Sequence, residues 1–88
     1  MEIILSPKAM EDLQYWKITG NKNVQKKIEA LIINIKISSF NGIGQPEALK
    51  YLLTEFWSRR INKEHRIIYQ VVDEIIEITS LKGHYGQL

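Results

Sequence analysis

Two hydrophobic periods divide this chain, and they constrain its fold more than any other feature. In the first half, apolar residues recur every three or four positions, the spacing of one face of an α-helix. The helical set consists of Val24, Ile28, Leu31, Ile32 and Ile35. In the second half, apolar residues such as Ile67, Tyr69 and Val71 alternate along the chain, as in a strand. Between them, Phe40–Pro46 contains two glycines and a proline, which predicts an ordered loop and not a linker between domains.

The chain is predicted to open with a short strand and a pair of helices. The strand covers Glu2–Leu5, and the residues that follow it have the composition of a helix start. Ser6 is the expected N-cap and Pro7 the first helical residue. Gly20 and Asn21 are expected to end this helix. The second helix follows after a short connection, so the two helices should form an antiparallel pair.

The remaining residues are predicted to form strands separated by short turns. The expected strands are Lys50–Leu53, Phe56–Ile61, His65–Val72 and Ile75–Leu81. Short turns between consecutive strands imply an antiparallel meander. The predicted fold class is therefore α+β, with an N-terminal strand, a two-helix hairpin and a meander packed on the helices.

Composition agrees with a single folded domain over residues 1–88. Of these residues, 44% are hydrophobic and 25% are charged, which is typical of a globular protein. Cysteine is absent, and the two histidines have no metal-ligand spacing, so neither a disulfide framework nor a metal site is expected. No cofactor is expected. No signal-like opening or membrane-length apolar run is present, which favours a cytoplasmic protein.

Basic residues are concentrated in one part of the chain. The net charge is only +2, and it does not by itself indicate a nucleic-acid partner. Between residues 50 and 66, however, five cations stand against two acids. The five are Lys50, Arg59, Arg60, Lys63 and Arg66. This local excess is suited to a surface that binds an anion.

Two arginines are predicted to lie side by side in the sheet. If residues 62–64 form a three-residue hairpin loop, Arg60 lies opposite Arg66 and their side chains share a face. Like charges directly across a strand pair are destabilising. Two interpretations remain open: both side chains extend into water or the register differs, or the pair binds an anion such as phosphate. Alternation places Arg59 on the other face from Arg60.

Four segments of the second half carry a resemblance to a known family. They are Pro46-Glu47-Ala48-Leu49-Lys50, Phe56-Trp57-Ser58-Arg59-Arg60-Ile61, Glu64-His65-Arg66-Ile67-Ile68-Tyr69 and Gly83-His84-Tyr85. The chain resembles the YoeB/Txe toxins of bacterial toxin–antitoxin modules in these four segments. The resemblance also includes the Tyr15-Trp16 pair and the N-terminal arrangement of a strand, a serine and a helix. These toxins belong to the wider RelE-like superfamily. The likeness covers nearly the whole chain.

The resemblance implies a fold and a function. It implies a RelE-like domain of the microbial-ribonuclease type that cuts mRNA at codons in the ribosomal A site and so inhibits translation. It also implies neutralisation by a cognate antitoxin of the YefM/Axe type and, in some members, homodimers. Two alternatives stay open: a ParE-like toxin that acts on DNA gyrase, and a non-catalytic module that binds RNA or an antitoxin.

The same resemblance assigns roles to residues of this chain. It implies catalytic roles for Glu47, Arg66, His84 and Tyr85. RNA-binding roles are implied for Lys50, Arg59 and Arg60, although alternation makes Arg59 the weakest of the three. The chain departs from the family in continuing through residues 86–88, where members often stop at or just after the His-Tyr pair.

These residue types are suited to metal-free cleavage of RNA. Attack by the ribose 2′-hydroxyl needs a base, an acid for the leaving oxygen and cations for the charged phosphorane. Glu47 is the candidate base, and His84 the candidate acid. The simpler interpretations are that Glu47 caps the segment after Pro46 and that His84 belongs to a solvated tail. His65 is predicted to be structural, since it falls on the core-facing side of its strand.

Overall fold

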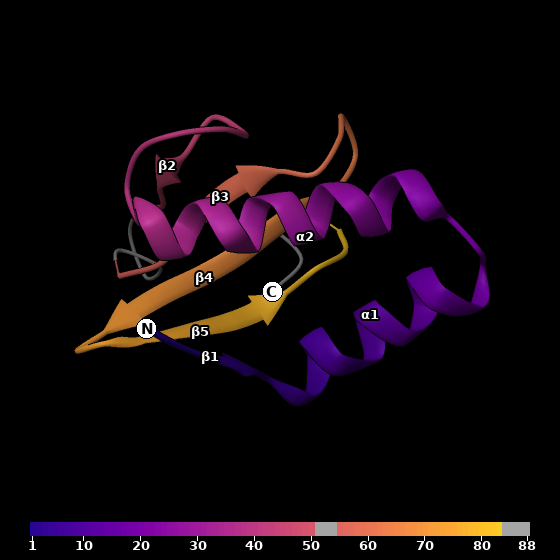
Figure 1. Cartoon of the computed structure of the whole chain (residues 1–88), viewed down its shortest axis with the longest axis horizontal. Coiled ribbons are helices and arrows are strands. Elements are labelled where there is room, and N and C mark those ends of the chain that lie inside the picture. The colour runs from indigo at the N-terminus through magenta and orange to yellow at the C-terminus, as the bar shows by residue number, and fades with distance from the viewer. Residues whose placement is uncertain (51–54, 84–88) are drawn as a thin grey trace.

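The computed structural model describes residues 1–50 and 55–83, and it forms one mixed sheet with two helices (Figure 1). In chain order the elements are β1 (Glu2–Leu5), α1 (Pro7–Ile18), α2 (Lys22–Ile37), β2 (Glu47–Ala48), β3 (Trp57–Arg60), β4 (Arg66–Val72) and β5 (Ile75–Ser80). The strand order across the sheet is β1-β5-β4-β3-β2. The predicted α+β class is confirmed.

The pairing of the strands combines a meander with one parallel addition. Strands β2 to β5 pair in sequence order, each antiparallel to the next, as the short turns predict. Strand β1 joins the free edge of β5 in parallel. A parallel pair needs a long crossover. Both helices lie between β1 and the meander in sequence, and they form much of this crossover connection.

Side-chain caps set where each helix begins. The Ser6 hydroxyl accepts a hydrogen bond from the Ala9 N–H at 3.0 Å, and Pro7 is the first helical residue, as predicted. Gly20 and Asn21 end the first helix as predicted: its last residue is Ile18, and the Asn21 N–H donates to the Trp16 oxygen at 3.2 Å. The Asn21 side chain also caps the second helix, accepting from the Val24 N–H at 3.1 Å. An N-cap side chain satisfies one of the helix donors that lack an intrahelical partner. Gly20 reverses the chain between the helices with a φ of +69°.

The hydrophobic core lies between the helices and one face of the sheet. The predicted helical residues Leu31 and Ile35 are fully buried against sheet residues that include Ile67 and Tyr69. In Figure 1, α2 lies in front of β3 and β4. Because strand side chains alternate, the neighbours of these sheet residues project from the other face, called here the helix-free face. The sequence pattern of β4 therefore predicted its orientation correctly.

One predicted strand is not found where the sequence placed it. The structure forms β2 at Glu47–Ala48, ahead of the predicted Lys50–Leu53, and Lys50 itself lies outside any strand. The rest of that prediction, residues 51–54, lies outside the described residues. Strand pairing explains the shift: Glu47 lies opposite Ser58 on β3, and the local sequence pattern does not predict this partner. In the described ranges, no helix is long and apolar enough to cross a membrane.

Candidate functional site

The helix-free face of the sheet brings together three of the predicted site residues. Glu47 lies opposite Ser58, and Arg60 lies opposite Arg66 in the same sheet. Directly opposed residues in an antiparallel pair project from one face, and residues two apart on a strand share that face. Glu47, Arg60 and Arg66 therefore share one side, with Ser58 and the fully buried Ile68 between them.

The Arg60–Arg66 register confirms the predicted hairpin. Arg60 is exposed, whereas Arg66 is half-buried at the start of β4. The Arg66 Nη1 group donates to the backbone oxygens of Asn62 at 2.8 Å and His65 at 3.1 Å. Asn62 also shapes the turn, since its side-chain oxygen accepts from the Glu64 and His65 N–H groups. The turn thus orients one guanidinium while the other remains in solvent.

The Glu47 carboxylate is exposed at the end of the loop that follows α2. Its strand is short, and two flanking backbone hydrogen bonds help to place it. The Arg60 N–H donates to the Gly44 oxygen at 2.6 Å, and the Leu49 N–H donates to the Phe56 oxygen at 2.9 Å. Gly44 has a φ of +82°, and a Cβ there would lie 2.6 Å from Leu31 Cδ2. The loop therefore needs glycine at this position in order to reach Glu47 along this path.

Arg59 does not lie on this face, and its predicted contact with RNA is wrong. Its side chain is fully buried and has no exposed surface to offer. The Nε group donates to the Tyr69 hydroxyl at 3.1 Å. The two Nη groups donate to Asn34 Oδ1 and to the backbone oxygens of Ser38, Asn41 and Ile43. Arg59 thus holds the loop after α2, here called the arginine-bound loop (residues 38–43).

The buried tyrosine beside Arg59 is a second member of this cluster that sequence analysis missed. Tyr69 accepts from Arg59 and donates to the Ser39 backbone oxygen at 2.8 Å. Burial raises the pKa of the Tyr69 phenol above its usual range, and the nearby Arg59 charge partly opposes that rise. Strand alternation was the available signal, because it placed both residues on the helix-facing side.

Cations from three elements surround a hollow beside the arginine pair. Its volume is about 350 Å³, and its basic lining residues are Lys27 from α2, Arg60 from β3 and Lys63 from the turn. Lys63 belongs to the basic segment between residues 50 and 66, whereas Lys27 lies outside it, and the fold places both at this hollow. Lys50, the other predicted RNA-binding lysine, is exposed next to the buried Leu49. The hollow therefore groups three cations that come from separate parts of the sequence.

The predicted catalytic pair His84 and Tyr85 lies outside the described residues. The last described residue is Gly83, whose backbone oxygen accepts from the Arg66 N–H at 2.9 Å. The described chain therefore ends beside a predicted catalytic arginine. His65 has the structural role that alternation predicted: its ring packs edge-to-face on Trp16, with 4.9 Å between ring centroids.

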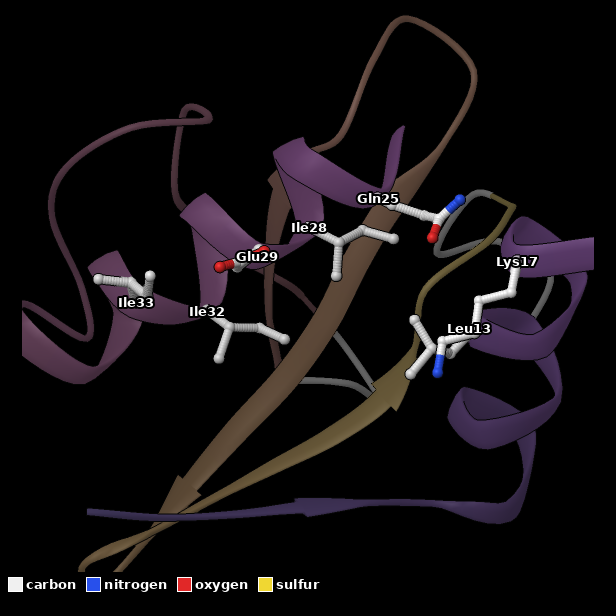
Figure 2. Close-up of a pocket in the computed structure, with 7 residues that line it drawn as sticks. All are labelled: Leu13, Lys17, Gln25, Ile28, Glu29, Ile32 and Ile33. Atoms are coloured by element: carbon white, nitrogen blue, oxygen red, sulfur yellow. The ribbon is translucent and has the colours of Figure 1, made fainter. Parts of the chain in front are cut away.

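A separate apolar groove lies between the helices. Its volume is about 400 Å³, and it is lined mainly by Leu13 of α1 with Ile28, Ile32 and Ile33 of α2 (Figure 2). Figure 2 shows the Leu13 side chain directed toward α2. This groove contains none of the predicted site residues. In residues 1–50 and 55–83, no three His, Asp or Glu side chains are grouped to hold a metal ion.

Comparison with known proteins identifies the family. A sequence model of the YoeB-like toxins of bacterial type II toxin–antitoxin systems matches residues 5–85. The chain belongs to this family. Toxin YoeB of Escherichia coli strain K12 is 42% identical over 85 residues, which cover 97% of this chain and all of that protein.

Solved structures of YoeB toxins have the same fold. The YoeB dimer from Staphylococcus aureus superposes with a TM-score of 0.88 at 45% identity, covering 97% of this chain and 98% of that one. A toxin chain in the heterotetrameric YoeB–YefM complex from the same organism gives a TM-score of 0.87, also at 45% identity and with the same coverage. The likeness therefore extends across the YoeB-like domain and includes both faces of its sheet.

Proposed function

We propose that this YoeB-like toxin is a ribosome-dependent endoribonuclease that cleaves mRNA at A-site codons and so inhibits translation. The observation that carries the proposal is the shared placement of Glu47, Arg60 and Arg66 on the helix-free face. A carboxylate on the same sheet face as two guanidiniums provides a proton acceptor together with groups that bind phosphate. The described chain ends at Gly83 beside Arg66, one residue before His84.

The proposed reaction is transesterification by the ribose 2′-hydroxyl. Glu47 takes the proton of that hydroxyl as its oxygen attacks the adjacent phosphorus. Arg66 stabilises the negative charge that develops on the phosphorane. His84 gives a proton to the departing 5′-oxygen, and Tyr85 orients the substrate next to it. The products are a 2′,3′-cyclic phosphate and a 5′-hydroxyl, so neither water nor an oxidant is consumed.

The ribosome would supply what the small domain lacks. The Glu47 carboxylate and the Arg60 side chain are both exposed, so these two groups are open to solvent. An open site orients a flexible RNA strand poorly, and orientation can account for much of a catalytic barrier. Lys50, Arg60 and the basic hollow would bind neighbouring phosphates, whereas the A site would hold the codon. The protein would act in the cytoplasm, where ribosomes present the mRNA substrate.

We also propose that a YefM-like antitoxin neutralises the protein. The support is the S. aureus YoeB–YefM heterotetramer, whose toxin chain is 45% identical to this one. The S. aureus YoeB dimer supports a homodimer in the same way. An acidic, partly disordered antitoxin segment could cover the basic helix-free face by charge complementarity.

Primer extension on mRNA in a translating extract tests the proposed function. The wild type should produce discrete new 5′ ends at A-site codons. Glu47→Gln and His84→Ala should each reduce cleavage by about 10²-fold or more, because each removes a proton-transfer group. Glu74→Gln is the matched control, since Glu74 is exposed in the turn between β4 and β5.

Two other outcomes would contradict the proposal. Translation arrest without new 5′ ends in the wild type would mean that the protein blocks the ribosome by binding alone. Normal translation in its presence would direct attention to DNA gyrase, the target of the ParE-like alternative. Full cleavage by both variants would exclude Glu47 and His84 as the acting groups while leaving the nuclease itself in place.

A further inference from the structure

The chain beyond β5 is fixed by contacts from outside the sheet ladder. The Leu81 N–H donates to the Asp12 carboxylate at 3.0 Å, and the Leu81 oxygen accepts from Trp16 Nε1 at 2.9 Å. The Gly83 N–H donates to His65 Nδ1 at 2.9 Å. The Gly83 oxygen accepts from the Arg66 N–H at 2.9 Å. Both ends of this three-residue exit segment (residues 81–83) are therefore anchored.

His65 and Arg66 are consecutive, and together they bind both backbone polar groups of Gly83. This contact is a two-point attachment, called here the Gly83 clamp. Two hydrogen bonds in different directions fix the orientation of a peptide unit as well as its position. Gly83 also has a φ of +88°, a conformation in which a side chain would be strained. The clamp therefore fixes the position and the orientation of Gly83 at the end of the exit segment.

The His65 ring is itself held in place. Trp16 contacts it edge-to-face, with an angle of 80° between the ring planes. Trp16 is buried, and its own indole N–H is used by Leu81. For Nδ1 to accept a hydrogen bond it must carry a lone pair, so the neutral ring has its proton on Nε2. The exposed Glu64 carboxylate lies 3.8 Å from that Nε2, on the side where the proton is expected.

We propose that His65 is a positioning residue for the proposed reaction: through the Gly83 clamp it fixes the peptide unit that directly precedes the proposed catalytic dipeptide His84-Tyr85. The inference rests on the proposed function, because it assigns the clamp a purpose only if residues 84 and 85 act in cleavage. His65 itself does not touch the RNA. Its contribution is geometric, and a displacement of about 1 Å at a catalytic group can cost about 10²-fold in rate.

A merely structural histidine makes a different prediction from a positioning one. If His65 only fills space beside Trp16, the effect of each substitution on cleavage should depend on the size and aromatic character of the new side chain. If the Nδ1 acceptor matters, the effect of each substitution on cleavage should depend on where the new side chain places an acceptor atom. Asparagine puts its side-chain oxygen near the Nδ1 position, whereas glutamine puts its oxygen near the Nε2 position and phenylalanine has no acceptor.

The test compares His65→Asn, His65→Gln and His65→Phe in the full chain. Cleavage is measured as a single-turnover rate on saturating programmed ribosomes, and ribosome binding is measured separately. We expect His65→Asn to stay within about threefold of the wild-type rate. We expect His65→Gln and His65→Phe to fall by about 10- to 100-fold, with ribosome affinity unchanged. Thermal unfolding of each variant shows whether the fold is retained.

Hydrogen exchange at the Gly83 amide gives a readout that does not depend on activity. The amide should be protected in the wild type and in His65→Asn, and it should exchange faster in the other two variants. Equal rates for all folded variants, or cleavage that follows side-chain size, would overturn the inference. If His65→Phe does not fold, the Asn and Gln pair still decides it. A wild type that cuts no mRNA would instead refute the proposed function, and the inference with it.

Discussion

Arg59 and Arg60 are neighbours on β3, yet they lie in opposite surroundings. Arg59 faces the helices, is fully buried, and donates to a hydroxyl, an amide oxygen and three backbone oxygens. Arg60 faces the helix-free side, is exposed, and lies across from Arg66. The same residue type thus builds the fold on one face and offers charge to a ligand on the other.

This comparison shows how the protein separates stability from function. A buried guanidinium is costly unless its donors are satisfied, and here the arginine-bound loop satisfies them with neutral acceptors. That loop leads directly to Glu47, so the helix-facing arginine helps to place a residue of the helix-free face. The pair of Arg60 and Arg66 has the opposite effect on stability. Two like charges opposite each other on neighbouring strands lower the stability of the fold, but they are suited to binding an anionic ligand.

The largest expected effect is on stability and comes from Arg59. Arg59→Met keeps the length of the side chain but leaves the oxygens of Ser38, Asn41 and Ile43 without their donor. We expect the free energy of unfolding to fall by about 3–5 kcal/mol, measured by urea denaturation. Arg60→Met is the matched control and should change it by about 0.5 kcal/mol or less. Similar losses for both variants would mean that the two faces do not differ as described.

A smaller effect is expected on ribosome binding and comes from Arg60. Arg60→Gln should weaken binding by about tenfold at low salt and reduce the slope of log affinity against log salt by about one. Lys36→Gln, an exposed change near the end of α2, is the control and should leave the slope unchanged. If both variants behave alike, the positive charge that matters is not confined to the helix-free face.

The smallest effect concerns Tyr69 and alkaline pH. Its pKa is raised by burial, so the folded state holds the phenol proton more tightly than the unfolded state. The resulting contribution to the free energy of unfolding is present below the phenol pKa of the unfolded state, about 10. It is lost as the pH rises through the pKa of the folded state. Tyr69→Phe should cost about 1 kcal/mol near neutrality, since it removes two hydrogen bonds.

The difference in the free energy of unfolding between Tyr69→Phe and the wild type should therefore shrink above about pH 10, because only the wild type loses the contribution of the phenol proton. Urea midpoints of both proteins between about pH 8 and about pH 11 measure it. A constant difference over that range would mean that Tyr69 titrates alike in the folded and unfolded states.

Several features of the fold could be predicted because they depend on nearby residues. The helix of Val24 and Ile35 follows from apolar spacing, and the start of α1 follows from the Ser6-Pro7 dipeptide. The Arg60–Arg66 register follows from the length of one turn. The site residues Glu47 and Arg66 came from the family resemblance, and the structure places both on one face. Their catalytic roles remain proposals.

Other features could not be predicted, because they depend on contacts between distant segments. The early position of β2 depends on pairing with Ser58, and the parallel place of β1 depends on a crossover through both helices. Arg59 was assigned to RNA by resemblance, although alternation alone indicated the opposite face. The loop that encloses it comes from residues 16 to 21 positions earlier in the chain.

By itself, the sequence determined the α+β class, the cap of the first helix, the period of the second, the meander and the register of the arginine pair. These depend on local sterics and on side-chain alternation, which act over a few residues. Only the tertiary structure decided which arginine is buried, which strand Glu47 joins and how Gly83 is held by His65 and Arg66. Those outcomes depend on satisfying buried polar groups, and their partners are brought together only when the chain has folded.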